Sequence, residues 1–211
     1  MNINIYVANN SHVEYAKSIC DLMYISAQER GTGIAKRSPE YIEEKMRSGK
    51  AVIALDGTEL VGFSYIETWS HSKFVANSGL VIAHKYRNLG IAKRVKKKIF
   101  ELSRKHYPDA KIFSITTGLA VMKINTGMGF KPVPFSELTD DKEFWAGCKG
   151  CKNFDILERN EFKMCLCTGL LYEPALFKAK NKITPALALV GKSVFINPIM
   201  KINSIKSIKK L

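Results

Sequence analysis

The stretch that most constrains this chain is GLVIAHKYRNLGIAKRVKKKIFELSRK, at residues 79–105, where an apolar strand pattern leads through a short turn into a long helical pattern. Apolar residues at helical spacing predict the buried face of a helix that begins after Gly90, namely Ile91, Val95, Ile99 and Leu102. The basic residues between them are predicted to lie mostly off that face: Lys93, Arg94, Lys96, Lys97 and Lys98. A fold of this chain must therefore join a buried strand to a buried helix through an exposed basic turn.

The turn before this helix is a candidate phosphate-binding site. The first N–H groups of a helix lack partners within it and lie at the positive end of its dipole, so a helix start beside a glycine can bind phosphate through its backbone. Arg87 would add a guanidinium group that suits an oxyanion. A nucleic-acid-binding helix and a solvated basic helix behind a structural turn remain open as alternatives. The glycines and lysine of a P-loop or a Rossmann fingerprint are absent here.

Periodicity along the rest of the chain predicts a mixed α/β (α+β) domain with both hairpins and crossover helices. Ser11 and Glu14 form a candidate capping box for the first helix, and Ser38 with Pro39 is typical of the start of the second. The predicted strands are 2–8, 51–55, 59–69, 73–82 and 111–116, with an extended segment after Phe130, and the predicted helices are 11–29, 39–49, 91–105 and 119–128.

The net charge of +14 is unevenly distributed. No acidic residue follows Glu173, whereas eight lysines lie between Lys178 and Lys210. Such a tail attracts polyanions or is simply solvated, and its one aromatic residue, Phe195, offers little base stacking, which disfavours nucleic acid as a partner. The chain has no run of eighteen apolar residues and no signal-peptide pattern at its start, so we expect a cytoplasmic protein without a membrane partner.

Four of the five cysteines form two close pairs, Cys148-x-x-Cys151 and Cys165-x-Cys167. Four thiolates can complete a tetrahedral zinc shell, and a metal would stabilise a small segment with little core of its own. The alternative is that these residues are unligated thiols that pack as small apolar groups.

The segments LVIAHKYRNLGIAKRVKKKIFELS and NTGMGFKPV resemble two conserved segments of the GNAT superfamily of N-acetyltransferases. The resemblance covers about 1–135 and implies a mostly antiparallel central sheet flanked by helices, with acetyl-CoA as co-substrate. It divides the chain into a GNAT core (1–135), a cysteine-bearing extension (136–177) and a basic tail (178–211). It also implies that Leu80, Val81 and Ile82 bind the pantetheine arm of CoA. The turn that would hold its diphosphate comprises Arg87, Asn88, Leu89, Gly90, Ile91 and Ala92.

A narrower resemblance concerns the acceptor. RGTGIAKRSPEYIEEKMRSGKAVIAL resembles a segment of the acetyltransferase domain of N-acetylglutamate synthases, and the cysteine-bearing segment resembles stand-alone bacterial GNAT proteins assigned to arginine biosynthesis. Glutamate is then the expected acceptor, with Arg37 binding its carboxylate and Lys73 as a weaker alternative. Another amine, succinyl-CoA as donor, a non-catalytic acyl-CoA-binding module and self-association into a homodimer all remain open.

Transfer of an acyl group to an amine needs a proton acceptor and a stabilised oxyanion. Backbone N–H groups near Leu80 could stabilise the oxyanion if a bulge at Ser78–Gly79 exposes them. Glu67 and His71 are the candidate bases. Where many family members carry a tyrosine as general acid, this chain has Asn125, which can orient a substrate but cannot donate a proton in the same way. The source of the leaving-group proton is thus undefined in the sequence.

Overall fold

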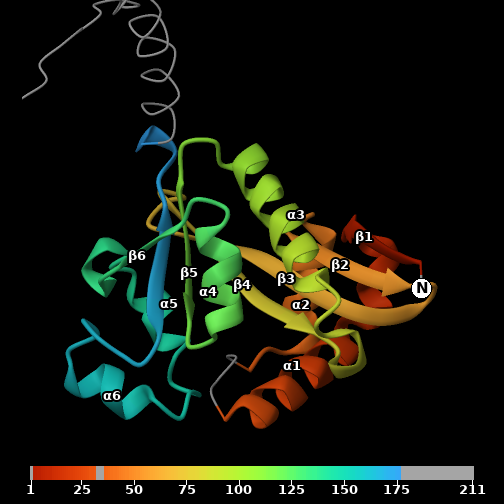
Figure 1. The fold of residues 1–211 in the computed structure, drawn as a ribbon, viewed down its shortest axis with the longest axis horizontal. Coiled ribbons are helices and arrows are strands. Elements are labelled where there is room, and N and C mark those ends of the chain that lie inside the picture. The colour runs from red at the N-terminus through yellow and green to blue at the C-terminus, as the bar shows by residue number, and fades with distance from the viewer. Residues whose placement is uncertain (1, 32–35, 177–211) are drawn as a thin grey trace, which may run out of the picture. The chain divides into compact units, whose positions relative to one another are not determined.

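The computed structural model describes residues 2–31 and 36–176, and Figure 1 shows its ribbon. Met1–Pro174 form one compact unit, and of the second unit, Ala175–Leu211, only the first two residues are described. The predicted basic tail (178–211) therefore lies outside the described residues. In the part that the structure describes, no helix is both long enough and apolar enough to cross a membrane.

The elements predicted as far as residue 133 are present, and the chain continues with two short helices and a further strand. The strands are β1 (Ile3–Val7), β2 (Ala51–Asp56), β3 (Glu59–Trp69), β4 (Phe74–Ile82), β5 (Lys111–Thr116), β6 (Lys131–Val133) and β7 (Thr168–Tyr172). The helices are α1 (Ala16–Arg30), α2 (Pro39–Arg47), α3 (Ile91–His106), α4 (Leu119–Thr126), α5 (Lys142–Ala146) and α6 (Phe154–Arg159). Short 3-10 turns lie at Asn10–Tyr15, His84–Tyr86 and Phe135–Glu137.

The strands form one seven-stranded sheet in the order β1-β2-β3-β4-β5-β7-β6. Every neighbouring pair is antiparallel except β4 and β5, which are parallel. This arrangement confirms the predicted mixed fold with a mostly antiparallel central sheet. The single parallel pair lies at the centre and is joined by the crossover helix α3, as a parallel connection requires.

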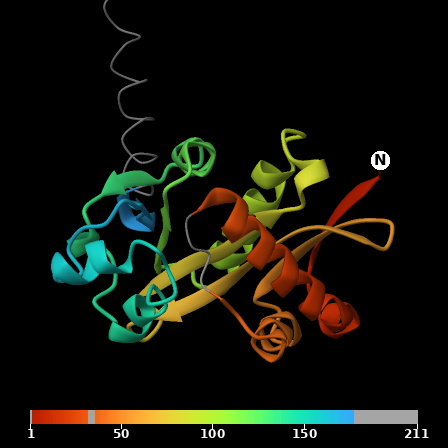
Figure 2. The same cartoon turned by 90° about the horizontal axis from the view of Figure 1, so that it is seen from below.

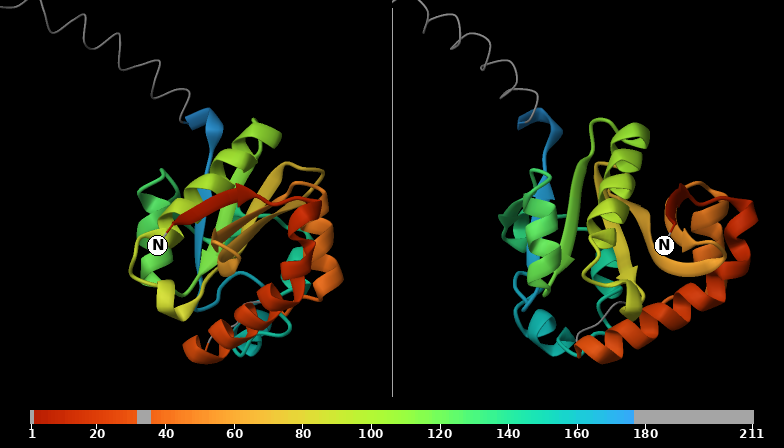
Figure 3. Two further views of the ribbon diagram at one scale, coloured as in Figure 1. Left: turned by 90° about the vertical axis from the view of Figure 1, so that its right-hand side faces the viewer. Right: turned by 45° about the vertical axis from the view of Figure 1, so that its right-hand side comes forward.

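Helices cover both faces of the sheet, and the alternation of side chains along each strand divides the core accordingly. On β2, Val52 and Ala54 face the cluster that contains the apolar stripe of α3, whereas Ile53 faces the cluster of α1 and α2. Figure 2 shows α1 and α2 on one side of the strands and α3 on the other, and Figure 3 shows the same layers from two further directions. A third cluster, around Phe113 and Trp145, packs α5 and α6 against the sheet.

Two predicted helix starts have different outcomes. Ser38 caps α2 by accepting a hydrogen bond from the Tyr41 N–H, with Pro39 in the first turn, as predicted. The capping box of Ser11 and Glu14 was wrong: Asn9 is the cap of a 3-10 turn, with His12 as its reciprocal partner, and α1 begins only at Ala16. Because the Asn9 side chain accepts from the free N–H groups, the cap lies two residues before the predicted cap, Ser11.

The segment 136–174 contributes to the central sheet itself. β7 lies between β5 and β6, with Phe113 opposite Leu171 on one side and Lys131 opposite Leu171 on the other. Leu170 and Leu171 are buried by this pairing. The strand that completes the sheet therefore comes from the part of the chain that carries the cysteines.

Candidate functional site

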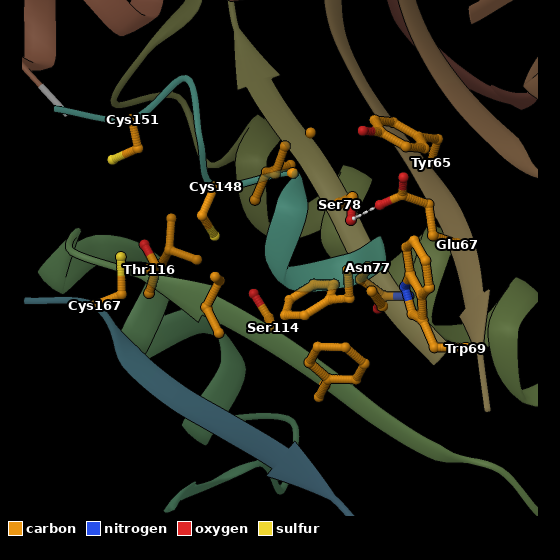
Figure 4. Close-up of a pocket in the computed structure, with 18 of the residues that line it drawn as sticks. Tyr65, Glu67, Trp69, Asn77, Ser78, Ser114, Thr116, Cys148, Cys151 and Cys167 are labelled. Carbon is orange, nitrogen blue, oxygen red and sulfur yellow. Dashed lines mark hydrogen bonds between the residues drawn. The ribbon is translucent and has the colours of Figure 1, made fainter. Parts of the chain in front are cut away.

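The site begins where β4 and β5 separate. The two strands pair only from Phe74–Lys111 to Ala76–Phe113, and no pairing between them follows in the described structure. From Asn77 onward, one backbone edge of β4 therefore faces a gap rather than a strand. A pocket occupies this gap, with Asn77–Leu80 on one side and Ser114–Thr117 on the other. Figure 4 shows the side chains that line it.

A β-bulge lies beside this gap. Ser78 is opposite Tyr65 and Val81 is opposite Phe63, so Gly79 and Leu80 together face the single residue Ser64. The bulge adjoins the predicted position at Ser78–Gly79. Gly79 has a φ of 63°, and a Cβ added there would lie 2.4 Å from the Tyr65 ring. Glycine is thus required here both by the backbone conformation and by the close approach of β3.

The far end of β4 leads into the predicted phosphate turn. Gly90 is the N-cap of α3 and has a φ of 76°, and Asn88 in the turn before it has a φ of 63°. The first turn of α3 contains no acidic residue. The first N–H groups of this 16-residue helix have no capping side chain among the described residues. Nothing lies within 4 Å of a Cβ added at Gly90, so the backbone there is open to a ligand.

Arg87 is engaged by neighbouring groups on α1 and β4. Its Nη2 lies 2.7 Å from the Glu29 carboxylate and donates to Ser26 Oγ at 3.0 Å, while its Nε donates to the carbonyl of Ile82. The hydrogen bond from the Arg87 guanidinium is the main reason why the pKa of Glu29 lies below its ordinary value. These contacts hold the turn against the C-terminal end of α1. Arg87 therefore also positions the turn, a role that the sequence analysis did not predict.

At the other end of the pocket, Glu67 is the centre of a buried hydrogen-bond network. Its side chain is 7% exposed, and it accepts hydrogen bonds from Tyr41 Oη and from Ser78 Oγ, the latter at 2.6 Å. Arg37 lies with Nη2 at 3.4 Å from Glu67 and donates from Nε to Tyr65 Oη at 2.9 Å. The structure therefore brings together two predicted residues, Glu67 and Arg37. It adds Tyr41 and Ser78, whose roles appear only when α2, β3 and β4 meet.

The tyrosines of this network are protonated at neutral pH. Burial, followed by the nearby Glu67 carboxylate, raises the pKa of both Tyr41 and Tyr65. Burial opposes the charge of Arg37, but Tyr65 and Glu67 outweigh it and raise the guanidinium pKa. The network thus holds a carboxylate, a guanidinium and two phenolic hydroxyls in one half-buried group.

Other predicted site residues lie elsewhere. His71 and Lys73 are exposed in the β3–β4 connection, and neither lines the pocket. Asn125 is completely buried on α4, and neither polar atom of its side chain has a hydrogen-bond partner within the described residues. The roles given to these three residues stay predictions.

The four clustered cysteines lie together, but their described arrangement gives no support for a metal centre. No group of three or more His, Cys, Asp or Glu side chains in the described ranges is placed to hold a metal ion, so the prediction of a zinc site at Cys148, Cys151, Cys165 and Cys167 is unsupported. Burial and the neighbouring thiols raise the pKa of Cys148 to about 11 and that of Cys167 to about 12. At neutral pH these residues are therefore protonated, and they pack in the cluster of Phe113 and Trp145. Figure 4 shows Cys148 and Cys167 beside Thr116, at the opposite end of the pocket from Tyr65.

For one further polar residue near the gap, the helical spacing predicted the wrong exposure. Lys96, predicted to lie off the buried face of α3, is 1% exposed. Its Nζ donates to Asn77 Oδ1 at 3.2 Å and lies 5.1 Å from the centroid of the Phe130 ring. Position 96 follows Ala92 by one turn and precedes Ile99, so it flanks the apolar stripe. That spacing alone would not distinguish a buried lysine from a solvated one.

No family model matches this sequence, and no curated protein sequence matches it. Solved structures do. N-acetylglutamate synthase from Neisseria gonorrhoeae, complexed with coenzyme A and N-acetyl-glutamate, superposes with a TM-score of 0.59 at 16% identity over 82% of this chain. A GNAT-family acetyltransferase from Staphylococcus aureus Mu50 gives 0.57 at 18% identity, covering 82% of this chain and 99% of that one. YncA, a putative acetyltransferase from Salmonella typhimurium with acetyl-CoA, gives 0.57 at 9% identity, with 82% and 95% covered. The matched part of the Neisseria synthase is only 35% of its length.

Proposed function

From the GNAT fold, which this chain shares with these acetyltransferases, we propose that it is an N-acyltransferase that uses an acyl-CoA donor. The observation that carries the proposal is the gap between β4 and β5, with an unpaired β4 edge from Asn77 onward and an open helix start after Gly90 at the end of the same strand. An extended amide-containing arm can pair with the strand edge, as an added strand would. The diphosphate attached to that arm then meets the N-terminus of α3. Acetyl-CoA is the proposed donor.

We propose that the acceptor is a small α-amino acid. Arg37 and Glu67 provide one positive and one negative group, 3.4 Å apart. A zwitterionic amino acid can place its carboxylate at Arg37 and its ammonium at Glu67, which would then accept the proton released when the amine attacks. Residues 30–55 resemble a segment of N-acetylglutamate synthases, which favours glutamate as the acceptor. That acceptor would give the protein a role in arginine biosynthesis.

The test is an assay of thiol release. The full chain is mixed with acetyl-CoA or succinyl-CoA and each of the common amino acids, and the acylated product is identified by mass spectrometry. We expect release with acetyl-CoA and glutamate, and loss of most of the activity in Glu67→Gln. Release with a different amine or with succinyl-CoA would change the substrate but keep the reaction. Binding of CoA without transfer to any amine would favour a non-catalytic acyl-CoA-binding module.

A further inference from the structure

The buried amine of Lys96 lies close to the place where the reactive end of the donor is expected. This inference rests on the proposed function. If the diphosphate binds at the Gly90 turn, at the C-terminal end of β4, the pantetheine arm must run back along β4 toward Asn77. The thioester then lies at the narrow end of the gap, because β4 and β5 begin to pair at Ala76 and Phe113. Asn77 is the first residue of β4 beyond that pairing and lines the pocket.

Lys96 is held at this position by a fixed amide. Asn77 Nδ2 donates to Ser103 Oγ at 2.7 Å, and Ser103 Oγ donates to the carbonyl of Ile99 at 2.8 Å. These bonds orient the Asn77 side chain so that its Oδ1 faces Lys96 and accepts from Nζ at 3.2 Å. The lysine uses one of its three N–H bonds there. A buried ammonium with this little compensation is costly to the fold, which suggests a functional reason for the residue.

A second buried polar group lies in the same neighbourhood. Lys96 Nζ lies 5.1 Å from the centroid of the Phe130 ring. The backbone N–H of Phe130 donates to the backbone carbonyl of Asn125 at 3.1 Å. The Asn125 side chain is 0% exposed, and its amide has no hydrogen-bond partner within the described residues. Buried polar atoms normally have partners. Lys96 contacts the Phe130 ring and Asn125 is bonded to the Phe130 backbone, and both side chains have hydrogen-bonding capacity that the described residues leave unused, although neither lines the pocket itself.

The acid strength of this amine suits proton donation to sulfur. Burial alone lowers the pKa of Lys96 to about 7, whereas an ordinary thiol has a pKa of about 8.5. Transfer from the ammonium to a thiolate is therefore downhill. Two charged or titratable side chains lie near Phe130: Tyr172, whose ring contacts that of Phe130, and Arg104, which stacks on Tyr172. The elements before and after Phe130, α4 and β6, also carry Lys123 and Lys131, which are both exposed. Burial alone lowers the pKa of Lys96, and these side chains do not contribute to the change.

We propose that Lys96 is the general acid of the reaction and that Asn77 positions it. When the amine has added to the thioester and the C–S bond breaks, the electron pair of that bond goes to sulfur. One N–H bond of the Lys96 ammonium breaks, its proton forms the S–H bond of CoA, and a neutral amine remains. The acceptor nitrogen loses two protons in all. The first, lost from the ammonium before attack, passes through Glu67 to solvent, and the second, lost after the nitrogen has added to the thioester, restores the Lys96 ammonium, so each turnover releases one proton. Lys96 thus supplies the leaving-group proton that Asn125 cannot donate.

The test compares Lys96→Met with Lys98→Met, a matched change at an exposed lysine on the same helix. CoA itself is the probe: it is bound to each protein at a saturating concentration, and its thiol is titrated by the ultraviolet absorbance of the thiolate. We expect the wild type and Lys98→Met to lower the pKa of the bound thiol relative to free CoA. Lys96→Met should bind CoA with unchanged affinity but lose that shift. In turnover assays, Lys96→Met should lower kcat by about 10²-fold and abolish the alkaline fall of kcat that deprotonation of Lys96 causes, with little change in the KM for the donor.

The outcomes separate the two proposals. Failure of the wild type to bind CoA would overturn the proposed function, and the Lys96 role with it. Normal CoA binding with an unshifted thiol in the wild type would overturn only the role of Lys96, whether or not any variant folds. An identical thiol titration in Lys96→Met and the wild type would do the same.

Discussion

Single residues define the gap between β4 and β5, and Gly79 is the clearest case. Its positive φ disfavours any other residue, and a Cβ added there would lie 2.4 Å from the Tyr65 ring, so there is no room for a side chain. The bulge that it permits keeps Ser78 within hydrogen-bond distance of Glu67 while interrupting the β3–β4 ladder. One residue thus shapes both the strand edge and the end of the pocket that contains Glu67.

Gly79→Ala should destabilise the protein far more than Gly57→Ala. Both glycines have a φ near +60°, but nothing lies within 4 Å of a Cβ at Gly57. Gly57→Ala should cost about 1–2 kcal/mol for the left-handed backbone, and Gly79→Ala should add about 1–3 kcal/mol for overpacking against Tyr65. Urea unfolding of both variants measures the difference. Equal losses would mean that the Tyr65 contact does not constrain the bulge.

Arg37 is expected to act on the acceptor rather than on the donor. Arg37→Ala should raise the KM for the amino-acid acceptor by about tenfold or more, a loss of roughly 1.4 kcal/mol in binding, and leave the KM for acetyl-CoA nearly unchanged. Arg47→Ala, which removes an exposed arginine paired with Glu43 on α2, is the control. Steady-state kinetics with each substrate varied in turn gives both constants. A similar loss for both substrates would indicate that Arg37 maintains the pocket instead of binding the acceptor.

At the scale of elements, α3 carries two features of the site: an open first turn and one buried cation on a mostly apolar face. Val95 and Ile99 are 0% exposed and join α3 to the sheet. Lys96 interrupts this packing. A helix selected only for stability would place an apolar residue at that position.

Lys96→Met should therefore stabilise the protein in a pH-dependent way. The pKa of Lys96 is about 7 in the folded protein against an ordinary value of 10.5, so the unfolded chain binds the extra proton between these values, and wild-type stability rises with pH across that interval. Below pH 7 the penalty is complete. The variant should exceed the wild type by a few kcal/mol at pH 6, an order of magnitude that follows from roughly 1.4 kcal/mol per pKa unit, and the gap should close toward pH 10.

Urea unfolding at a series of pH values, with Lys98→Met as the control, measures this gap. A gap that stays constant with pH would mean that Lys96 does not change protonation on folding. A gain in stability together with a loss of turnover would place Lys96 among residues kept for function at a cost to the fold.

The turn before α3 gives the second prediction at this scale. Arg87→Glu should weaken CoA binding at least about tenfold, because it puts a negative charge beside an expected diphosphate. The control is Glu29→Gln, which removes the carboxylate partner of Arg87 and should leave affinity unchanged or improved. Calorimetric titration with CoA at two salt concentrations measures both. If Glu29→Gln weakened binding as much as Arg87→Glu does, the pair would act by holding the turn to α1.

At the scale of the whole molecule, the central sheet depends on a strand that arrives late in the sequence. β5 pairs with β4 over only three positions, whereas β7 pairs with it from Ile112 to Thr116. Without β7, β5 would lose its longer partner and β6 would have no neighbour in the sheet. The wall of the pocket formed by β5 therefore relies on residues 168–172.

A chain ended at residue 135 should thus fail to fold cooperatively, whereas one ended at residue 174 should fold. The first lacks β7 and the cluster around Trp145, and the second keeps the whole compact unit Met1–Pro174. Near-ultraviolet circular dichroism and urea unfolding distinguish them. A cooperatively folded 1–135 fragment would show that the core needs no strand from the cysteine-bearing segment.

Much of the architecture follows from the sequence because its causes are local. The apolar spacing of α3, the cap at Ser38, and the strand–turn–helix unit at Gly90 each depend on residues close together in the chain, and the structure has all three. The GNAT fold could be inferred for the same reason, since its most distinctive segment is continuous. Local patterns failed where two side chains compete for the same N–H groups, as at Asn9 and Ser11.

The composition of the site was decided by tertiary structure. Glu67 meets Tyr41 from α2 and Ser78 from β4, residues 26 and 11 positions away, and no periodicity links them. Lys96 meets Asn77 because β4 packs against α3, while no group of described cysteines is placed to hold a metal ion. A side chain's ionisation and hydrogen-bonding partners depend on the low-dielectric surroundings that distant segments create. The sequence by itself could therefore determine the elements and the strand–turn–helix unit at Gly90, and only the packed structure decided which polar groups meet in the gap.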